Sequence, residues 1–349
     1  MSTLILPCAG ASSRYPNMRP KWALNHPDGS MMVTKGISGM NLSNVEKIVL
    51  TAYKGDVEKW NLNKAIKTSL QEIQIPFDII LLDTRTKSQS ETVVKSIENA
   101  NIDGHIIIKD CDDYLSCDIV EPNSVLVHSL HDMDEVIAKN KSYVITDTMG
   151  NITDIVEKSV INDLFCVGGY SFADAEKFLI TYDKIVDKVS SELYISHIIY
   201  QQLLDGVTFK AHKVERYSDW GTLEDWNKYK SEYKTIFTDL DGVLVENSAE
   251  YFEPIWGTTE AIQENVDYMN DLYDSGKCRI IITTSRKSSF KEVTISQLDR
   301  EGIKYHDIIF DLPHAERIVI NDFSKSNKYP TCSSVNIPRN SNNLKDFIK

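Results

Sequence analysis

The sequence lacks the features that mark membrane proteins, disulfide-rich proteins and nucleic-acid-binding proteins. No apolar run approaches the roughly 20 residues that a membrane helix needs. The 6 cysteines form no CxxC pair and no zinc spacing. Acidic residues outnumber basic ones by 51 to 38, so the net charge of -13 leaves no domain-wide basic surface for a phosphate backbone. We therefore expect free, mostly buried thiols, no membrane insertion and no nucleic-acid partner.

The start of the chain also lacks the basic leader and the long apolar run of a signal peptide. Together with the free thiols, this absence predicts a cytoplasmic protein. The sequence contains no internal repeat and no low-complexity tract. A chain of 349 residues with ordinary hydrophobic content indicates two domains or one large domain, and either is long enough to bury a core.

Short apolar runs alternate with amphipathic stretches along most of the chain, which predicts an α/β fold with mostly parallel sheets and helices on both faces. A charged, helical stretch over 222–234 has no long apolar run and indicates the junction between domains. We predict two doubly wound domains, over residues 1–232 and 233–349. Residues 141–158 differ from the rest, because they read as a β-hairpin that turns at Met-Gly-Asn.

The second domain repeats the strand–helix alternation. We expect strands at 235–242, 278–286, 306–311 and 316–322, helices over 260–275 and 290–301, an edge strand at 333–337 and a short final helix.

The first strand leads into a run of small residues, AGASS, followed by Arg14 and Lys21. Small side chains allow backbone amides to approach a phosphate closely, and the amide dipoles favour negative charge. Arg14 and Lys21 add positive charge where a pyrophosphate leaving group would develop. This loop therefore suits a nucleoside triphosphate.

Several segments, in order, resemble motifs of the sugar-nucleotide pyrophosphorylases and related nucleotidyltransferases. They are the AGASSR loop with its later Pro-Lys, HIIIKDCDDYL, IVEKSVINDLFCVGGY, SELYISHII and ERYSDWGT, so the resemblance covers roughly residues 1–230. It implies a Rossmann-like, GT-A-like domain. It also implies a nucleotide site made of Leu6, Ala9, Gly10, Ala11, Ser12, Ser13, Gln89 and Thr92.

The same resemblance implies a Mg²⁺ site and an acceptor site. Asp112 is the favoured metal ligand, with Asp110 as the alternative, and Asp219 is the second ligand. The residues expected to hold the acceptor phosphate and sugar are Glu157, Lys158, Gly169, Tyr170 and Glu192. Ser159 stands where the family usually has proline, so the sequence does not determine which nucleotide base and which acceptor the site binds.

The implied reaction is direct displacement. An oxygen of the acceptor phosphate attacks the α-phosphorus of a nucleoside triphosphate, and pyrophosphate leaves. Arg14 and Lys21 would stabilise the departing pyrophosphate, and Lys158 would orient the acceptor.

A second motif, IFTDLDGVLVE, begins at residue 236 and places Asp239 and Asp241 at the end of an apolar strand. Two such carboxylates can hold a hard cation, and one of them can attack a phosphorus atom. The motif resembles motif I of the haloacid dehalogenase-like phosphatases. That resemblance implies a phospho-aspartate on Asp239, acid–base chemistry by Asp241 and a second Mg²⁺ site completed by Asp322.

The resemblance also assigns Thr284, with Thr283 as the register alternative, to bind the transferring phosphoryl group. The family's lysine has no clear match, so Arg317 is the nearest cation, with Lys287 and Lys325 as alternatives. The short intervals after the motif leave no room for a large cap.

These features favour a bifunctional enzyme that transfers a nucleotidyl group to a sugar 1-phosphate or similar small phosphate and also hydrolyses a phosphomonoester. The family resemblance implies products for capsule, polysaccharide or glycan assembly. One alternative is a cytidylyltransferase for a non-sugar phosphate such as phosphocholine or a phosphonate. Another keeps the transferase but makes the second domain a non-catalytic regulatory or oligomerisation module. The oligomeric state stays open.

Overall fold

The computed structural model describes residues 1–133, 139, 141–188, 192–247, 255–322 and 331–348. The chain divides into two compact units, Met1–Lys230 and Ser231–Lys349. Among the residues described, no helix has both the length and the apolar character needed to cross a membrane.

The first unit is built on a sheet of nine strands, in which seven follow the order β11-β7-β10-β5-β1-β3-β4 and β8 joins β10 to β9. The strands are β1 (Ser2–Cys8), β3 (Val45–Tyr53), β4 (Phe77–Leu82), β5 (Ile106–Lys109), β7 (Ser124–Ser129), β8 (Ser142–Thr146), β9 (Ile152–Glu157), β10 (Leu164–Phe172) and β11 (Lys210–Lys213).

Strand β10 makes this sheet mixed, although the sequence predicts a mostly parallel one. It runs antiparallel to β5, β7 and β8, whereas β1 pairs in parallel with both β3 and β5. The reason is the β8–β9 hairpin, which precedes β10 in place of a crossover helix. The α/β class is confirmed for this unit, with a mixed sheet.

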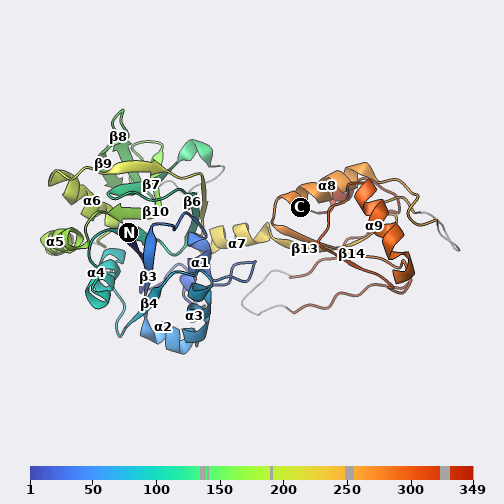
Figure 1. The fold of residues 1–349 in the computed structure, drawn as a ribbon, viewed down its shortest axis with the longest axis horizontal. Helices are drawn as coiled ribbons and strands as arrows, with labels where there is room; N and C mark the ends of the chain where they lie inside the picture. Colours follow the sequence, from blue (N-terminus) through green and yellow to red (C-terminus); the bar gives the residue numbers. More distant parts are fainter. Residues whose placement is uncertain (134–138, 140, 189–191, 248–254, 323–330, 349) are drawn as a thin grey trace. The chain divides into compact units, whose positions relative to one another are not determined.

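Helices cover both faces of the sheet (Figure 1). Alternate residues of β1 show this, because Leu4 and Leu6 pack in one buried cluster and Ile5 packs in another. The first cluster includes side chains of α1 (Met32–Ile37), α2 (Lys54–Lys59) and α3 (Asn63–Gln71). The second includes side chains of α4 (Gln89–Ala100), α5 (Ala175–Ile185) and α6 (Ile195–Leu204).

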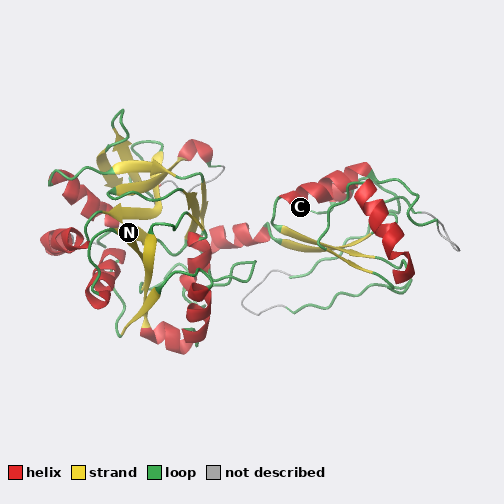
Figure 2. Ribbon diagram, in the orientation of Figure 1, coloured by secondary structure: helices red, strands yellow, loops and turns green. Residues whose placement is uncertain are grey.

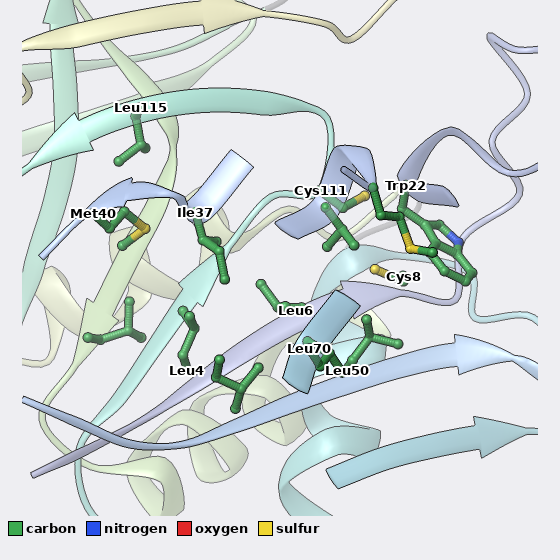
Figure 3. Close-up of a cluster of buried hydrophobic side chains, with 14 of the residues drawn as sticks. Leu4, Leu6, Cys8, Trp22, Ile37, Met40, Leu50, Leu70, Cys111 and Leu115 are labelled. Carbon is green, nitrogen blue, oxygen red and sulfur yellow. The ribbon is translucent and has the colours of Figure 1, made fainter. Parts of the chain in front are cut away.

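The first cluster ends in Trp22, Cys8 and Cys111, which gather at one end of the group of apolar side chains (Figure 3). All five described cysteines other than Cys332 are buried, and all six are free, which confirms the expectation of free and mostly buried thiols.

A second, smaller sheet has the order β12-β6-β2, with β2 at Gly39–Met40, β6 at Asp113–Cys117 and β12 at Arg216–Asp219. Its antiparallel register sets Asp219 opposite Asp113. Residues far apart in the sequence are thereby brought to one edge. The remaining helical elements of this part of the chain are the short 3-10 helices η1 (Lys21–Ala23), η2 (Leu130–Asp132) and η4 (Val186–Lys188), and α7 (Leu223–Ser231).

The second unit contains a three-stranded parallel sheet of β13 (Lys234–Asp239), β14 (Cys278–Thr283) and β15 (Asp307–Ile309). Helices α8 (Gln263–Asp274) and α9 (Lys291–Arg300) lie close to these strands (Figure 2). Two 3-10 helices complete it, η5 (Ser288–Phe290) and η6 (Leu344–Asp346). Its buried cluster combines Leu240 and Ile280 with Val266 and Leu298 of the two helices.

Two strands predicted for the second unit are not formed. Residues 316–322 and 333–337 have no strand conformation. Within 316–322, Ile318, Val319 and Ile320 are 74%, 59% and 91% exposed. Three β-branched residues favour extended backbone, but a strand also needs a hydrogen-bonded partner and a buried face. Among the residues that the structure describes, none pairs with this run as a strand, and its apolar side chains are exposed.

Candidate active site

A pocket of about 630 Å³ opens where β1 and β5 end in the first unit. Segments from across this unit line it, including the loop after β1, the start of α4, the loop after β5, the β8–β9 hairpin and the end of β12. The sequence-predicted residues that line it are Gly10, Ala11, Ser12, Ser13, Arg14, Lys21, Gln89, Thr92, Asp110, Asp112, Glu157, Lys158, Tyr170, Glu192 and Asp219.

Three predicted site residues do not line the pocket. Leu6 belongs to the buried apolar cluster, and Ala9 is fully buried. A Cβ placed on Gly169 would meet the Leu126 side chain at 2.4 Å, so this glycine faces the core. The neighbouring Gly168 lines the pocket instead, because successive residues of a strand point to opposite faces.

Gly168 is a site residue that the sequence analysis missed. Its φ of +72° is left-handed, and a Cβ there would lie 2.6 Å from Asp113 Oδ2 and 2.7 Å from Asp110 Oδ2. The Asp110 amide also donates to the Gly168 carbonyl at 2.7 Å. Only glycine combines this backbone conformation with this close approach to two carboxylates.

The small-residue loop after β1 is tied down from two sides. Arg85 donates to the Gly10 carbonyl at 2.9 Å, pairs with Asp56 and stacks over the Tyr53 ring. The Tyr15 hydroxyl donates to the Thr222 carbonyl at 2.9 Å. The amides of this loop are therefore held in position before any ligand binds.

Three aspartates after β5 present their carboxylate oxygens within 4.8 Å of one another. Asp113 pairs with the fully buried Lys109, and Asp110 accepts a hydrogen bond from Gln89. Burial and the charge of Asp112 raise the pKa of Asp110 to about 6. Burial acts to raise the pKa of Asp112 as well, but Lys21 and Arg14 outweigh it and hold that pKa at about 2.

Asp112 and Asp219 lie near each other. A Cβ placed on Gly221 would be 3.0 Å from Asp219 Oδ1 and 3.5 Å from Asp112 Oδ2, so these two oxygens are at most 6.5 Å apart. Hard carboxylate oxygens, here from the loop after β5 and from the end of β12, are the donor set that Mg²⁺ prefers. The residues present therefore fit a magnesium site that includes Asp112 and Asp219.

Each of these two carboxylates is paired with a lysine. Lys21 pairs with Asp112, and Lys141 lies 2.5 Å from Asp219 Oδ2. The sequence analysis missed Lys141, because a single lysine in front of a strand resembles any solvent-facing residue. The signal was its place directly before the hairpin that carries Glu157 and Lys158.

The other end of the pocket contains the residues expected to hold the acceptor. The Ser196 hydroxyl donates to Glu157 at 2.6 Å, and the Ser142 hydroxyl donates to the same oxygen. The Lys158 ammonium lies 4.1 Å from the centre of the Tyr194 ring. This end combines fixed carboxylates with a cation and an aromatic surface.

In the second unit, Asp239 ends β13 and contacts one cation. Arg317 Nη2 lies 3.2 Å from Asp239 Oδ1. Lys287, the described alternative, is exposed and precedes η5, and Lys325 lies outside the described residues.

Asp241 is held by an arginine that the sequence analysis missed. Arg286 donates from Nη2 to Asp241 Oδ1 at 2.7 Å and from Nε to Oδ2 at 2.9 Å. The Arg286 side chain is fully buried, and it also donates to Gln297 at 2.8 Å and to Thr294 at 3.2 Å. Both oxygens of Asp241 therefore have a partner. The signal was an arginine three residues after the buried end of β14.

Among the remaining predicted residues of the second site, Thr283 lies directly opposite Asp239 in the parallel pair of β13 and β14. Thr284 is fully buried and accepts from the Arg286 amide, and Thr283 donates to the Thr238 carbonyl at 3.0 Å. Asp322 is exposed and lies outside any strand, because the strand expected at 316–322 does not form. Over the described residues, no metal-binding group of three acidic side chains occurs in this unit.

No family model and no curated protein matches this chain. Solved structures do. The nucleoside-diphosphate-sugar pyrophosphorylase from Vibrio cholerae RC9 aligns with a TM-score of 0.54 at 19% identity, over 65% of this chain and 98% of that one. The inositol-1-phosphate CTP transferase from T. maritima aligns with a TM-score of 0.51 at 13% identity, over 64% of this chain and 90% of that one. The CTP:phosphocholine cytidylyltransferase from Streptococcus pneumoniae aligns with a TM-score of 0.50 at 16% identity, over 65% of this chain and 96% of that one.

The first unit ends at Lys230 of 349 residues, which is about the share of the chain that these alignments cover. At such low identities the likeness concerns the fold. The chain thus contains an α/β unit with a mixed sheet whose fold is that of the nucleotidyltransferases.

Proposed function

We propose that the first unit transfers a nucleotidyl group from a nucleoside triphosphate to a small phosphorylated acceptor, such as a sugar 1-phosphate, and releases pyrophosphate. The observation that carries this proposal is the single pocket that brings the Gly10 loop and Lys21 together with Asp112 and Asp219. The loop offers amides and cations to a triphosphate, and the two aspartates offer oxygens to Mg²⁺.

The charge of the pocket supports a role for Mg²⁺. Seven carboxylates line it, from Asp110, Asp112, Asp113, Glu157, Glu192, Asp219 and Asp225, against five cationic side chains, from Arg14, Lys21, Lys87, Lys141 and Lys158. A triphosphate and an acceptor phosphate would add further negative charge, so divalent cations are needed to balance the site. When bound by Asp112 and Asp219, Mg²⁺ supplies Lewis-acid stabilisation of phosphoryl oxygens.

The chain's own residues supply position and charge. An acceptor phosphate oxygen forms a bond to the α-phosphorus, and the bond between that phosphorus and the bridging oxygen of pyrophosphate breaks. Lys21 and Arg14 stabilise the negative charge that develops on the leaving pyrophosphate. Lys158 orients the acceptor phosphate, and Glu157, fixed by Ser142 and Ser196, binds acceptor hydroxyls.

Pyrophosphate release tests this proposal. Purified protein is given each nucleoside triphosphate with a panel of sugar 1-phosphates and Mg²⁺. Asp112→Asn and Lys21→Ala should each lower the rate by about 10³-fold, by analogy with the loss of one strong electrostatic stabiliser. Asp205→Asn removes an exposed carboxylate paired with Lys184 and should leave the rate unchanged. Full activity of Lys21→Ala would refute the assignment.

One observation favours a non-sugar acceptor as the second candidate. The Lys158 ammonium donates to the Tyr194 hydroxyl and lies 4.1 Å from the ring centre, and that hydroxyl donates to Glu192 at 2.8 Å. An aromatic face beside a carboxylate is also a binding surface for a quaternary ammonium. Including phosphocholine and an aminoalkyl phosphonate in the panel separates this cytidylyltransferase-type reaction from sugar activation.

For the second unit, we propose phosphomonoester hydrolysis through a phospho-aspartate. The contact between Asp239 and Arg317 supports it, since a nucleophilic carboxylate needs a nearby cation to receive a phosphate dianion. Asp239 would attack phosphorus and expel the alcohol, and water would then release phosphate from the aspartyl ester. Asp241 would transfer the protons in both steps, which requires one of its bonds to Arg286 to open.

An assay on Asp239→Asn decides between this hydrolysis and a non-catalytic unit. A broad panel of phosphomonoesters is hydrolysed by the parent and by the variant in parallel. Loss of hydrolysis with retained pyrophosphate release assigns the activity to the second unit. Equal rates for parent and variant across the whole panel would identify a regulatory or oligomerisation module.

A further inference from the structure

Lys141 occupies a place in the pocket that mirrors that of Lys21. Both lysines pair with a carboxylate suited to bind Mg²⁺, Lys21 with Asp112 and Lys141 with Asp219. The two side chains are similarly enclosed, with exposures of 17% and 14%. Lys21 follows the nucleotide loop in the sequence, whereas Lys141 directly precedes β8 of the hairpin.

The position of Lys141 is set by the acceptor end of the pocket. Its carbonyl accepts from the Lys158 amide at 3.0 Å, and the next residue, Ser142, donates to Glu157. The residues expected to hold the acceptor therefore flank Lys141 directly.

A second contact keeps the Lys141 ammonium in the pocket wall. Its Nζ donates to the Tyr217 hydroxyl at 2.7 Å and lies 5.2 Å from the centre of the Tyr217 ring. The centre of the Phe165 ring lies 6.0 Å from the same nitrogen, and an aromatic ring attracts an ammonium. Loss of Asp219 as a partner would leave the ammonium close to where it now lies.

We propose that Lys141 binds the phosphate group of the acceptor, and that Asp219 holds Lys141 until a divalent cation takes up the Asp219 carboxylate. This inference rests on the proposed transferase function. A divalent cation and an ammonium repel each other when they share one carboxylate, so binding of the cation frees Lys141. The freed ammonium faces the acceptor end, where a phosphomonoester dianion is the matching ligand.

A purely structural role predicts different behaviour. If Lys141 served only to fix Asp219, its removal would disorder that carboxylate and weaken metal binding. If it competes with the metal and then binds phosphate, its removal should leave metal binding at least as tight as in the parent while weakening phosphate binding. Metal and phosphate affinities thus separate the two roles.

Titration calorimetry without nucleotide tests this. Mn²⁺ alone is titrated into the parent and into Lys141→Met, and inorganic phosphate is then titrated into each Mn²⁺-loaded protein. We expect Mn²⁺ to bind Lys141→Met as tightly as the parent or several-fold more tightly, and phosphate to bind about tenfold more weakly. Lys141→Arg should retain phosphate binding. Lys184→Met removes an exposed lysine paired with Asp205 and should change neither affinity.

Three results would overturn the proposal: weaker Mn²⁺ binding by Lys141→Met, phosphate binding equal to that of the parent, or no phosphate binding by the Mn²⁺-loaded parent. Lys141→Gln repeats the titrations if the methionine variant does not fold. Because neither titration involves turnover, a parent that binds Mn²⁺ and phosphate but releases no pyrophosphate would refute the proposed function and leave this inference standing.

Discussion

The two units place aspartates at strand ends in different ways. In the first unit, Asp112 follows β5 and Asp219 ends β12, and both line one pocket with lysines as partners. In the second unit, Asp239 and Asp241 come from a single strand end, and a fully buried arginine holds Asp241 at both oxygens. Carboxylates that converge from separate strands form a pocket, whereas two on one strand depend on a third element to complete a site.

The buried arginine gives the largest expected effect. Arg286→Ala leaves Asp241 without its bidentate partner and should lower the free energy of unfolding of the second unit by about 3 kcal/mol. Hydrogen exchange of β13 and β14 amides measures this. Lys304→Ala, which removes an exposed pair with Asp274, is the control and should change it little. Unchanged exchange in Arg286→Ala would show that the pair is not structural, and the contrast between the units would fail.

Gly168 offers a test of how tightly the first site is packed. Gly168→Ala places a methyl group against Asp110 and Asp113 in a left-handed backbone, and it should destabilise the first unit by about 2–3 kcal/mol and abolish transfer. Gly150→Ala is the matched control, since its φ is +81° but the space around it is open. It should cost only about 1 kcal/mol of backbone strain. Urea denaturation of both variants makes the comparison.

A smaller effect is expected at Arg85, which touches the nucleotide loop from outside the pocket. Arg85→Ala releases the Gly10 carbonyl and should raise KM for the nucleoside triphosphate about tenfold with a lesser change in kcat. Arg85→Lys should recover part of the loss. Steady-state kinetics at saturating acceptor provide the measurement, and a change confined to kcat would contradict a positioning role.

The smallest effect on stability is expected at Arg317, which is 40% exposed where it contacts Asp239. Arg317→Ala should change the free energy of unfolding by less than about 1 kcal/mol. Phosphomonoester hydrolysis, by contrast, should fall at least tenfold, because the dianion loses its nearest cation. Retained hydrolysis would mean that another cation serves the second site.

In the first unit, charged site residues that follow strands could be predicted from the sequence. Arg14, Lys21, Asp112 and Asp219 were selected from spaced motifs, and the structure brings all four to one pocket. The sequence does not fix which residues of β10 face the pocket and which face the core. A shift of one residue along a strand moves a side chain to the other face of the sheet. Gly168 was therefore missed in favour of Gly169.

The second unit shows where local pattern stops predicting structure. Its three parallel strands and two helices follow from the apolar runs. The strand expected at 316–322 is absent, because extended propensity does not supply a partner strand. The ion pairs of Lys141 and Arg286 could not be predicted from local sequence either. Whether a charged side chain beside a strand turns toward a carboxylate depends on tertiary packing.

The exposed Ile318–Ile320 run also bears on how the protein behaves at high concentration. Three β-branched apolar residues without a strand partner are a template for edge-to-edge pairing between molecules. Charged residues bracket the run, with Glu316 and Arg317 before it and Asp322 shortly after it. Such flanking charges act as gatekeepers against aggregation, so neutralising both ends should make the chain prone to precipitate even if its fold is intact.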